Sequence, residues 1–333
     1  MLSARFNLYK KLALIAASLA LCVVVLGAYV RLTDAGLGCP DWPGCYGTMT
    51  VPQSEAAISK AQQVFPDKKV EVGKAWREMA HRYLAGTLGL LVLALTTLSW
   101  AIKREIRNSV WLTTALLLII TLQAALGMWT VTMLLKPAIV TAHLIGGMTT
   151  LAILVWIAHR HWGYASENII RTDGMKLAIR VGLVILALQI ILGGWTSTNY
   201  AALACTDFPT CHGTMWPKMD FKDAFTFVRH LGESANGGTI TIEALTAIQW
   251  SHRLGALVTF LYLFTLSIKL MHYWQLRKLA SMLLVALVVQ VMLGVLNLLL
   301  HLPLVLAVAH NLVAALLVVI VVVLNSKITK KIR

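Results

Sequence analysis

The chain alternates between long apolar runs and shorter polar segments. Eight apolar runs stand out, at roughly 12–32, 78–100, 110–131, 139–158, 177–197, 250–271, 279–299 and 303–324. Each has about 20 residues, the length that an α-helix needs to cross ~30 Å of hydrocarbon. Because a bilayer offers the backbone no hydrogen-bond partners, such runs are expected to be helical. The pattern predicts an all-α membrane protein with eight transmembrane helices.

The first run has one alternative interpretation, a cleaved signal peptide, because Arg5, Lys10 and Lys11 precede it. Its apolar residues continue to Val30 without a small-x-small cleavage site. We therefore expect a retained first helix. Cys22, within this run, is expected to be a small buried apolar residue.

The charge is distributed unevenly between the two sides of the predicted membrane. The chain is 58% hydrophobic and 13% charged, with a net charge of +15. If both termini are cytoplasmic, that side holds 17 of the 29 Lys and Arg residues but 3 of the 14 acidic residues. This is the positive-inside distribution, so the charge indicates topology and not a nucleic-acid partner. No amphipathic transit segment precedes the first run, which favours a bacterial plasma (inner) membrane.

The two halves of the chain resemble each other. The matching pairs are "LGAYVRLT" (26–33) with "LGGWTSTN" (192–199), "AHRYLAG" (80–86) with "SHRLGAL" (251–257), "QAALG" (123–127) with "QVMLG" (290–294), and "TAHLIGG" (141–147) with "AVAHNLV" (307–313). Each half has four predicted helices, an even number, so both halves have the same orientation. The sequence predicts two parallel-repeat four-helix bundles, residues 1–165 and 166–333.

A short motif, Cys-x-Asp-aromatic-Pro-x-Cys-x-Gly, occurs once in each half. "CPDWPGCYG" starts at Cys39 and "CTDFPTCHG" starts at Cys205. Both fall on the predicted extracytoplasmic side, where cysteines oxidise. We expect the disulfides Cys39–Cys45 and Cys205–Cys211, each worth about 2 kcal/mol by loop-closure entropy. Free thiols, or a metal site that includes His212, are the alternatives.

Four histidines lie at matched positions near the extracytoplasmic ends of the predicted helices. They are His81, His143, His252 and His310, one pair in each half. Polar side chains inside a membrane are costly and usually mark function. Helix bundles hold cofactors between facing helices, and haem iron accepts an imidazole from each side. The four residues are therefore predicted to be haem iron axial ligands. Packing or proton-relay histidines are the alternative.

Arg82 and Arg253 each follow one of these histidines. An arginine pairs well with carboxylates, so these two are predicted to bind haem propionates. Two alternatives are equally possible: the arginines contact lipid headgroups, or they match only because the two halves are repeats of each other.

The halves differ at one position that bears on chemistry. Glu78 lies three residues before His81, whereas Gln249 lies three residues before His252. The i, i+3 spacing places Glu78 and His81 on the same helix face. A carboxylate there can move protons or stabilise positive charge, and an amide cannot ionise. Glu78 is therefore the predicted catalytic residue, unless it only forms an ion pair with Arg77 or Arg82.

Together, "EMAHR", "TAHLIGG", "SHRLGAL" and "AVAHN" in a duplicated four-helix unit with paired Cys loops resemble the haem A synthase (CtaA/COX15-like) family, of the disulfide-bearing type. The resemblance covers essentially the whole chain. It implies an oxidoreductase that converts the C8 methyl group of haem O to the formyl group of haem A for cytochrome oxidase, with the oxygen derived from water. It places the substrate between His81 and His143, haem b between His252 and His310, and catalysis at Glu78.

The resemblance also implies partners. These are haem O synthase, cytochrome oxidase assembly factors, an unidentified electron acceptor and a homo-oligomeric partner. Two other classes compete with it. A di-haem b electron-transfer protein explains the four histidines but gives Glu78 no role. A transporter with a parallel repeat usually breaks its helices near the midplane, and the apolar runs here contain no such central Gly or Pro.

Overall fold

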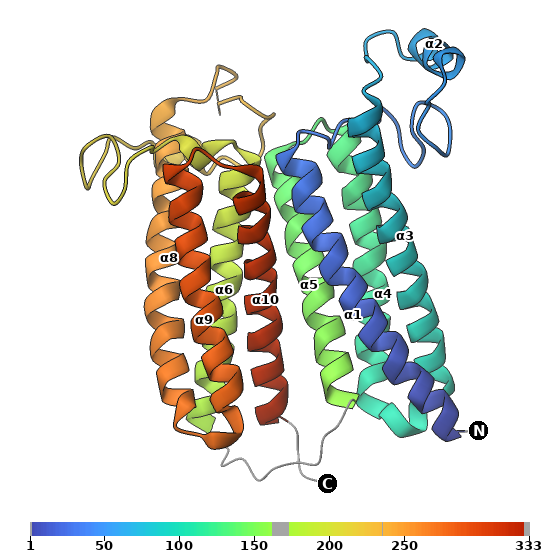
Figure 1. Cartoon of the computed structure of the whole chain (residues 1–333), viewed down its shortest axis with the longest axis vertical. Helices are drawn as coiled ribbons and strands as arrows, with labels where there is room; N and C mark the ends of the chain where they lie inside the picture. The colour runs from blue at the N-terminus through green and yellow to red at the C-terminus, as the bar shows by residue number, and fades with distance from the viewer. Residues whose placement is uncertain (1, 162–172, 235, 330–333) are drawn as a thin grey trace.

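The computed structural model describes residues 2–161, 173–234 and 236–329, and within these ranges it consists of helices and loops without a β-strand (Figure 1). The long helices are α1 (Leu2–Leu32), α3 (Val72–Ala101), α4 (Lys103–Thr132), α5 (Pro137–His161), α6 (Asp173–Thr198), α8 (Ile242–Met271), α9 (Trp274–Leu299) and α10 (Leu304–Thr329). Three short helices lie in the loops: α2 (Glu55–Val64), the 3-10 turn η1 (Ala201–Leu203) and α7 (Phe221–Ala224).

Each of the eight apolar runs coincides with one long helix. All eight helices are long and apolar enough to span a membrane, which confirms the predicted multi-pass helical protein. Among the helices that begin before their apolar runs are α3, which begins at Val72, and α8, which begins at Ile242. Thr241 caps α8 by accepting a hydrogen bond from the Ala244 N–H. Glu78 and Gln249 therefore lie well inside helices.

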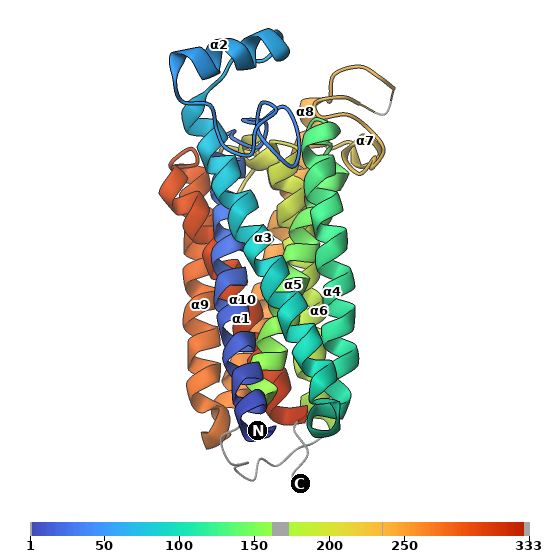
Figure 2. The same ribbon diagram turned by 90° about the vertical axis from the view of Figure 1, so that its right-hand side faces the viewer.

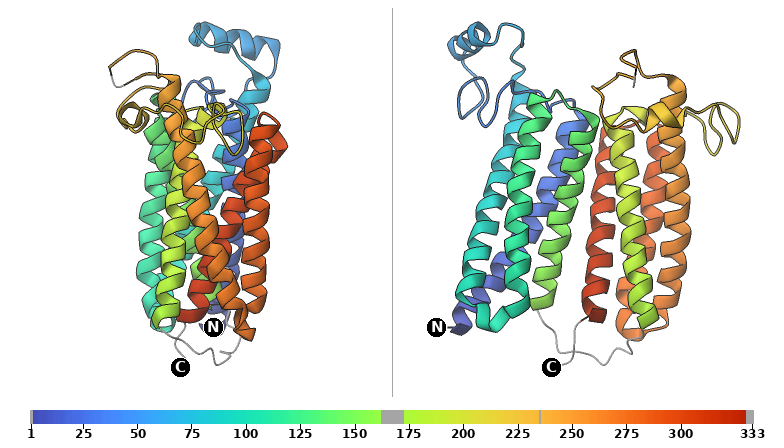
Figure 3. Two further views of the ribbon diagram at one scale, coloured as in Figure 1. Left: turned by 90° about the vertical axis from the view of Figure 1, so that its left-hand side faces the viewer. Right: turned by 180° about the vertical axis from the view of Figure 1, so that it is seen from behind.

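The helices gather into two bundles (Figures 1 and 3). The N-terminal bundle consists of α1, α3, α4 and α5, and the C-terminal bundle of α6, α8, α9 and α10. The start of α1 and the end of α10 lie at the same end of the molecule, and the long loops lie at the opposite end, called here the loop end. Figure 2 shows α2 standing beyond the helices at the loop end.

One apolar core runs through both bundles. It includes Leu95 of α3, Leu154 of α5, Ile179 of α6 and Leu263 of α8, all fully buried. Cys22 of α1 is exposed, so the expectation that it is buried was wrong. Its position on the outer face of the apolar helix suits a side chain that faces lipid.

The bundles meet along a seam formed by α1 and α5 on one side and α6 and α10 on the other. Gly194 of α6 lies so close to Leu144 of α5 that a Cβ at 194 would be 2.8 Å from the leucine methyl. The hydroxyls of Thr141 and Thr198 hydrogen-bond across the same contact at 3.1 Å. Close approach of two helix backbones at a small residue is typical of helix packing in membranes.

A polar contact joins the bundles at the loop end. Arg31 of α1 donates to the Tyr200 hydroxyl at 2.8 Å and to the Ser197 carbonyl at 3.0 Å. The Tyr200 hydroxyl in turn donates to Asp34 at 3.0 Å. The guanidinium also lies 4.1 Å from the centre of the Tyr200 ring. These contacts fix the first loop segment against the second.

Both predicted disulfides are present. Cys39 and Cys45 are bonded with their Cα atoms 4.8 Å apart, and Cys205 and Cys211 with theirs 4.9 Å apart. Each cysteine pair closes its own loop. The free-thiol and metal alternatives for these four residues are therefore not realised.

The rest of the repeated motif folds each loop in the same way. Asp41 accepts the backbone N–H groups of Tyr46 and Gly47, at 2.6 and 2.8 Å. Asp207 accepts those of His212 and Gly213, at 2.8 and 2.9 Å. The two glycines have φ of +75° and +74°, a region that L-residues rarely adopt. The peptide bond before each proline, Pro43 and Pro209, is cis.

Candidate functional site

Two of the four histidines face each other in the N-terminal bundle. His81 comes from α3 and His143 from α5, and their ring centroids are 6.4 Å apart with the planes at 81°. A metal–nitrogen bond is about 2 Å and a ring nitrogen lies roughly 1 Å from its centroid, so two imidazoles on one metal have centroids about 6 Å apart. The observed separation fits two axial ligands of one ion.

The other two histidines lie at corresponding depth in the C-terminal bundle. His252 comes from α8 and His310 from α10, which both belong to this bundle. In the described part of the chain, no three His, Cys, Asp or Glu side chains gather into a metal-binding cluster. The histidines therefore occur as pairs, which is the ligand set of a bis-histidine haem.

Each histidine ring packs against a glycine of a neighbouring helix. A Cβ on that glycine would lie 3.0 to 3.4 Å from the ring carbon Cε1 in all four cases: Gly27 with His81, Gly127 with His143, Gly193 with His252, and Gly294 with His310. The absence of a side chain at these glycines gives each imidazole its place between the helices.

Three of the four rings have a nitrogen that is available for ligation. The Nδ1 atoms of His81, His143 and His310 are buried and have no hydrogen-bond partner among the described residues. An unpaired buried polar atom is costly, so such atoms need an explanation. A bound metal group between each pair of rings provides one, and the donor set therefore fits haem.

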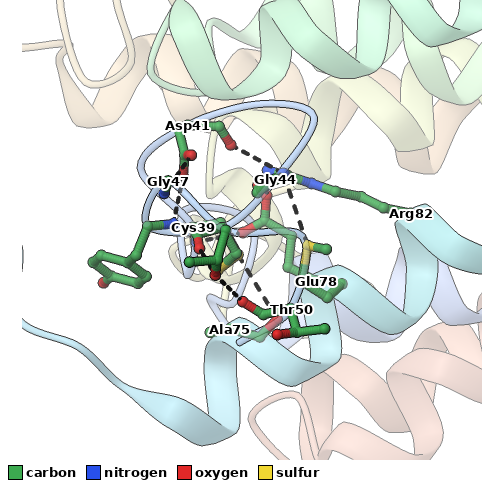
Figure 4. Close-up of a disulfide and its surroundings, with 12 residues drawn as sticks. Cys39, Asp41, Gly44, Gly47, Thr50, Ala75, Glu78 and Arg82 are labelled. Carbon is green, nitrogen blue, oxygen red and sulfur yellow. Dashed lines mark hydrogen bonds and ion pairs between the residues drawn. A yellow bond between two sulfur atoms is a disulfide. The ribbon is translucent and has the colours of Figure 1, made fainter. Parts of the chain in front are cut away.

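Glu78 is anchored in the first disulfide loop (Figure 4). Its side chain is 5% exposed, and its carboxylate accepts the Cys39 backbone N–H at 2.9 Å. It also forms an ion pair with Arg82, as one of the alternatives predicted. Gly38 allows this close approach, because a Cβ there would be 2.7 Å from the Lys74 backbone. The negative charge is therefore buried, paired and fixed in position.

Gln249 occupies the corresponding place on α8 and is bonded differently. Its side-chain amide donates to the Ala202 carbonyl at 2.9 Å. Its Oε1 is buried without a hydrogen-bond partner in the described ranges. The carboxylate of Glu78 thus accepts from its loop, whereas the amide of Gln249 donates to its loop.

The two arginines bind the disulfide loops. Arg82 donates to the carbonyls of Asp41, at 2.9 Å, and Gly44. Arg253 donates to the carbonyls of Thr210, at 2.8 Å, and Cys205, at 3.0 Å. That Arg82 and Arg253 also bind haem propionates stays a prediction. Their contacts with the loops could not be predicted from the sequence, because they depend on the directions of the loop carbonyls.

Glutamines near the C-terminal pair were not among the predicted site residues. Gln189 of α6 lies 3.0 Å from Nδ1 of His252, and Gln290 of α9 lies 3.2 Å from Nε2 of His310. A signal was available in the sequence, since each glutamine stands four residues before the glycine that contacts the same histidine.

The second disulfide loop has a strongly acidic carboxyl group. The Thr210 hydroxyl, with the backbone N–H groups of Gly213 and His212, holds the pKa of Asp207 well below its ordinary value. All three donors stabilise the charged form. The ionised Asp207 therefore helps to maintain the shape of its loop.

The helices and the histidine pairs place this chain in a class of multi-pass helical membrane proteins with paired histidines in their bundles. A family described as COX15-CtaA, cytochrome oxidase assembly protein, matches residues 10–322. The chain belongs to this family.

Its relatives carry a common name. The chain is 43% identical over 307 residues to the heme A synthase of Shewanella oneidensis, with 92% of each chain covered. It is 29% identical over 331 residues to the heme A synthase of Caulobacter vibrioides, again with 92% of each covered. A third relative, the heme A synthase of Bacillus licheniformis, is 28% identical over 208 residues, 61% of this chain and 63% of that one.

Proposed function

We propose that this chain is a haem A synthase, an oxidoreductase that converts haem O to haem A. The change of a methyl group to a formyl group takes one water molecule and releases four electrons and four protons. The family and the relatives over 92% of the chain support this activity. The observation that carries it is the combination of two buried histidine pairs with a buried carboxylate, Glu78, beside only one of them.

His81 and His143 hold the substrate haem in the N-terminal bundle. Their 6.4 Å ring separation and the unpaired Nδ1 atoms support this assignment. The bundle holds the haem in one position relative to Glu78, which lies on the same helix as His81. Fixed geometry of this kind lowers the entropic cost of reaction.

His252 and His310 hold haem b in the C-terminal bundle. When bound there, haem b would supply one-electron redox chemistry, and the final electron acceptor would lie outside the chain. Here the place of Glu78 is taken by Gln249, which cannot exchange a proton at neutral pH. That difference supports electron transfer in this half and oxidation in the other.

Glu78 takes a proton from water or stabilises positive charge that develops on the substrate. Arg82 and the Cys39 N–H hold its carboxylate in place. Arg82 and Arg253, near the loop end of α3 and α8, bind haem propionates in addition to their loop carbonyls.

The architecture is a parallel repeat of residues 1–165 and 166–333, with both termini cytoplasmic. The matched disulfide loops, histidines and glycines support it. The protein lies in a bacterial inner membrane with its Cys loops outside. Its partners are haem O synthase, cytochrome oxidase assembly factors, an electron acceptor and a second copy of itself.

Identification of the bound porphyrins tests the activity. The protein is produced together with a haem O synthase and purified, and its extracted haems are separated by chromatography. Haem O or haem A alongside haem B is expected. Haem B alone, with two equivalents per chain, would instead favour a di-haem b electron-transfer protein.

A further inference from the structure

Each histidine ring contacts a glycine of a neighbouring helix, and the residue four positions before that glycine is not the same in the two bundles. A five-residue pattern ending in Leu-Gly occurs once on each of the helices that face the histidines. Its copies are VVVLG (23–27) on α1, QAALG (123–127) on α4, QIILG (189–193) on α6 and QVMLG (290–294) on α9. Three copies begin with glutamine. The copy that faces His81 begins with Val23.

In the C-terminal bundle both histidines are bonded to these glutamines. Gln189 lies 3.0 Å from Nδ1 of His252, and its amide nitrogen also donates to the His252 backbone carbonyl at 3.1 Å. Gln290 lies 3.2 Å from the His310 ring. A partner on one ring nitrogen fixes the orientation of the imidazole and the basicity of the other nitrogen. Both rings are therefore held before haem binds.

In the N-terminal bundle neither ring has a side-chain hydrogen bond within the described ranges. Val23 has no polar side-chain atom to offer His81. Gln123 instead fits into a notch on α5, where a Cβ on Gly146 would be 1.7 Å from its amide nitrogen. The N-terminal rings thus lack the side-chain amide contacts of the C-terminal pair.

We propose that Gln189 and Gln290 are positioning residues that retain the haem of the C-terminal bundle, and that Val23 leaves His81 without a side-chain partner so that the N-terminal bundle can exchange its haem. This rests on the proposed function. A resident cofactor has to stay, whereas a substrate haem has to enter and its product has to leave. Loss of such an outer hydrogen bond typically lowers metal affinity 10–100-fold, which is enough to separate the two behaviours.

A glutamine at position 23 fits the local structure. Gln123 and Gln189 each lie against a glycine three residues after the histidine, Gly146 and Gly255. Gln290 has no such glycine beside it, since the residue three after His310 is Val313, and it still contacts the His310 ring. Leu84, three residues after His81, is therefore compatible with Val23→Gln.

Haem transfer to excess apomyoglobin tests the proposal without relying on activity. The purified holoprotein, loaded with haem B and haem O, is mixed with the acceptor, and each haem is followed by chromatography of the remaining complex. Gln189→Met and Gln290→Met should speed haem B loss by about 10–100-fold and leave haem O loss unchanged. Val23→Gln should slow haem O loss by a similar factor and leave haem B unaffected. Gln275→Met, at the far end of α9, is the matched control.

Haem B loss at the control rate in both glutamine variants would overturn the retention role. Haem O loss from Val23→Gln at the parental rate would overturn the exchange role, with Val23→Asn as the smaller amide if the first variant fails to fold. A failure of the proposed function can be distinguished from a failure of this proposal, because the parent protein would then contain no haem O or haem A. Haem B leaving the two bundles at equal rates would in that case still contradict the proposal.

Discussion

The Glu78 carboxylate and the Cys39 backbone N–H are joined by a hydrogen bond of 2.9 Å. This contact links the buried carboxylate of the N-terminal bundle to the disulfide loop above it. Because a hydrogen bond to an ionised acceptor is stronger and shorter than a neutral one, the loop and the carboxylate hold each other in place. The position of the proposed catalytic group therefore depends on the loop as well as on α3.

Glu78→Gln should abolish most haem A formation while the fold and haem B are retained. Glutamine is nearly isosteric, and Gln249 occupies the corresponding place on α8. Loss of one proton-transfer or electrostatic contribution typically costs about 10²–10³ in rate. Chromatography of haems extracted from producing cells should show haem O, or a hydroxylated intermediate, at the expense of haem A.

Gln249→Glu is the matched control for this substitution and should leave haem A formation largely intact. Haem A at the parental level in Glu78→Gln would reduce Glu78 to an ion-pair partner of Arg82. Retained haem B in the same extract shows that the bundles have folded.

The first disulfide should matter more for activity than the second. Replacing Cys39 and Cys45 with serine frees the loop whose N–H holds Glu78, so haem A formation should fall toward the level of Glu78→Gln. Replacing Cys205 and Cys211 should have a smaller effect on oxidation. The comparison uses haem A per haem B in purified protein, with mass spectrometry of non-reduced peptides to confirm each remaining disulfide. Equal losses from both double variants would refute the link between the first loop and Glu78.

His252→Ala or His310→Ala should remove the stable b haem, because each helix provides one of the two axial ligands. The reduced absorption spectrum and the pyridine haemochrome of the purified variant measure this loss. His272→Ala is a suitable control, since His272 is exposed and bonds to the Ile268 carbonyl in the turn before it. An unchanged low-spin b signal would rule out the assignment.

Asp207 should make the C-terminal loop sensitive to acid. Its pKa is lowered in the folded protein, so its stabilising contribution is present above the ordinary Asp value of about 3.9 and is lost as the pH falls below it toward the folded pKa. Asp207→Asn removes this contribution at every pH. The thermal midpoint of the variant should therefore lie below that of the parent at pH 7, and the difference should shrink toward pH 3. A difference that stays constant over this range would contradict the role of the ionised carboxylate.

Hydropathy was sufficient to locate the eight helices but not their ends at the loop side. Residues 72–77 and 242–249 include charged and polar side chains, so the apolar signal fades there although the helix continues. These turns are stabilised by a cap at Thr241 and by packing of residues such as Ala75 and Ala247 against the loops, which no local hydropathy window records.

The histidines and Glu78 could be found from the sequence because their types and spacing carry the chemistry. The loop role of Arg82 and Arg253 could not, because their acceptors are backbone carbonyls whose directions depend on turns and cis peptide bonds. The glutamine contacts fall between these cases. The spacing of each glutamine from a glycine is visible in the sequence. That position 23 has a valine in place of a glutamine becomes informative only when the structure shows that this position faces His81.

The close contact of Gly194 with Leu144 determines how near the two bundles pack to each other. A methyl group at position 194 would meet Leu144 at 2.8 Å and would force α6 away from α5. Since α5 carries His143 and α10 carries His310, a wider seam would lengthen the distance between the two proposed haem sites without a change in any proposed ligand. A glycine that touches neither histidine pair therefore governs how far apart the two proposed sites lie.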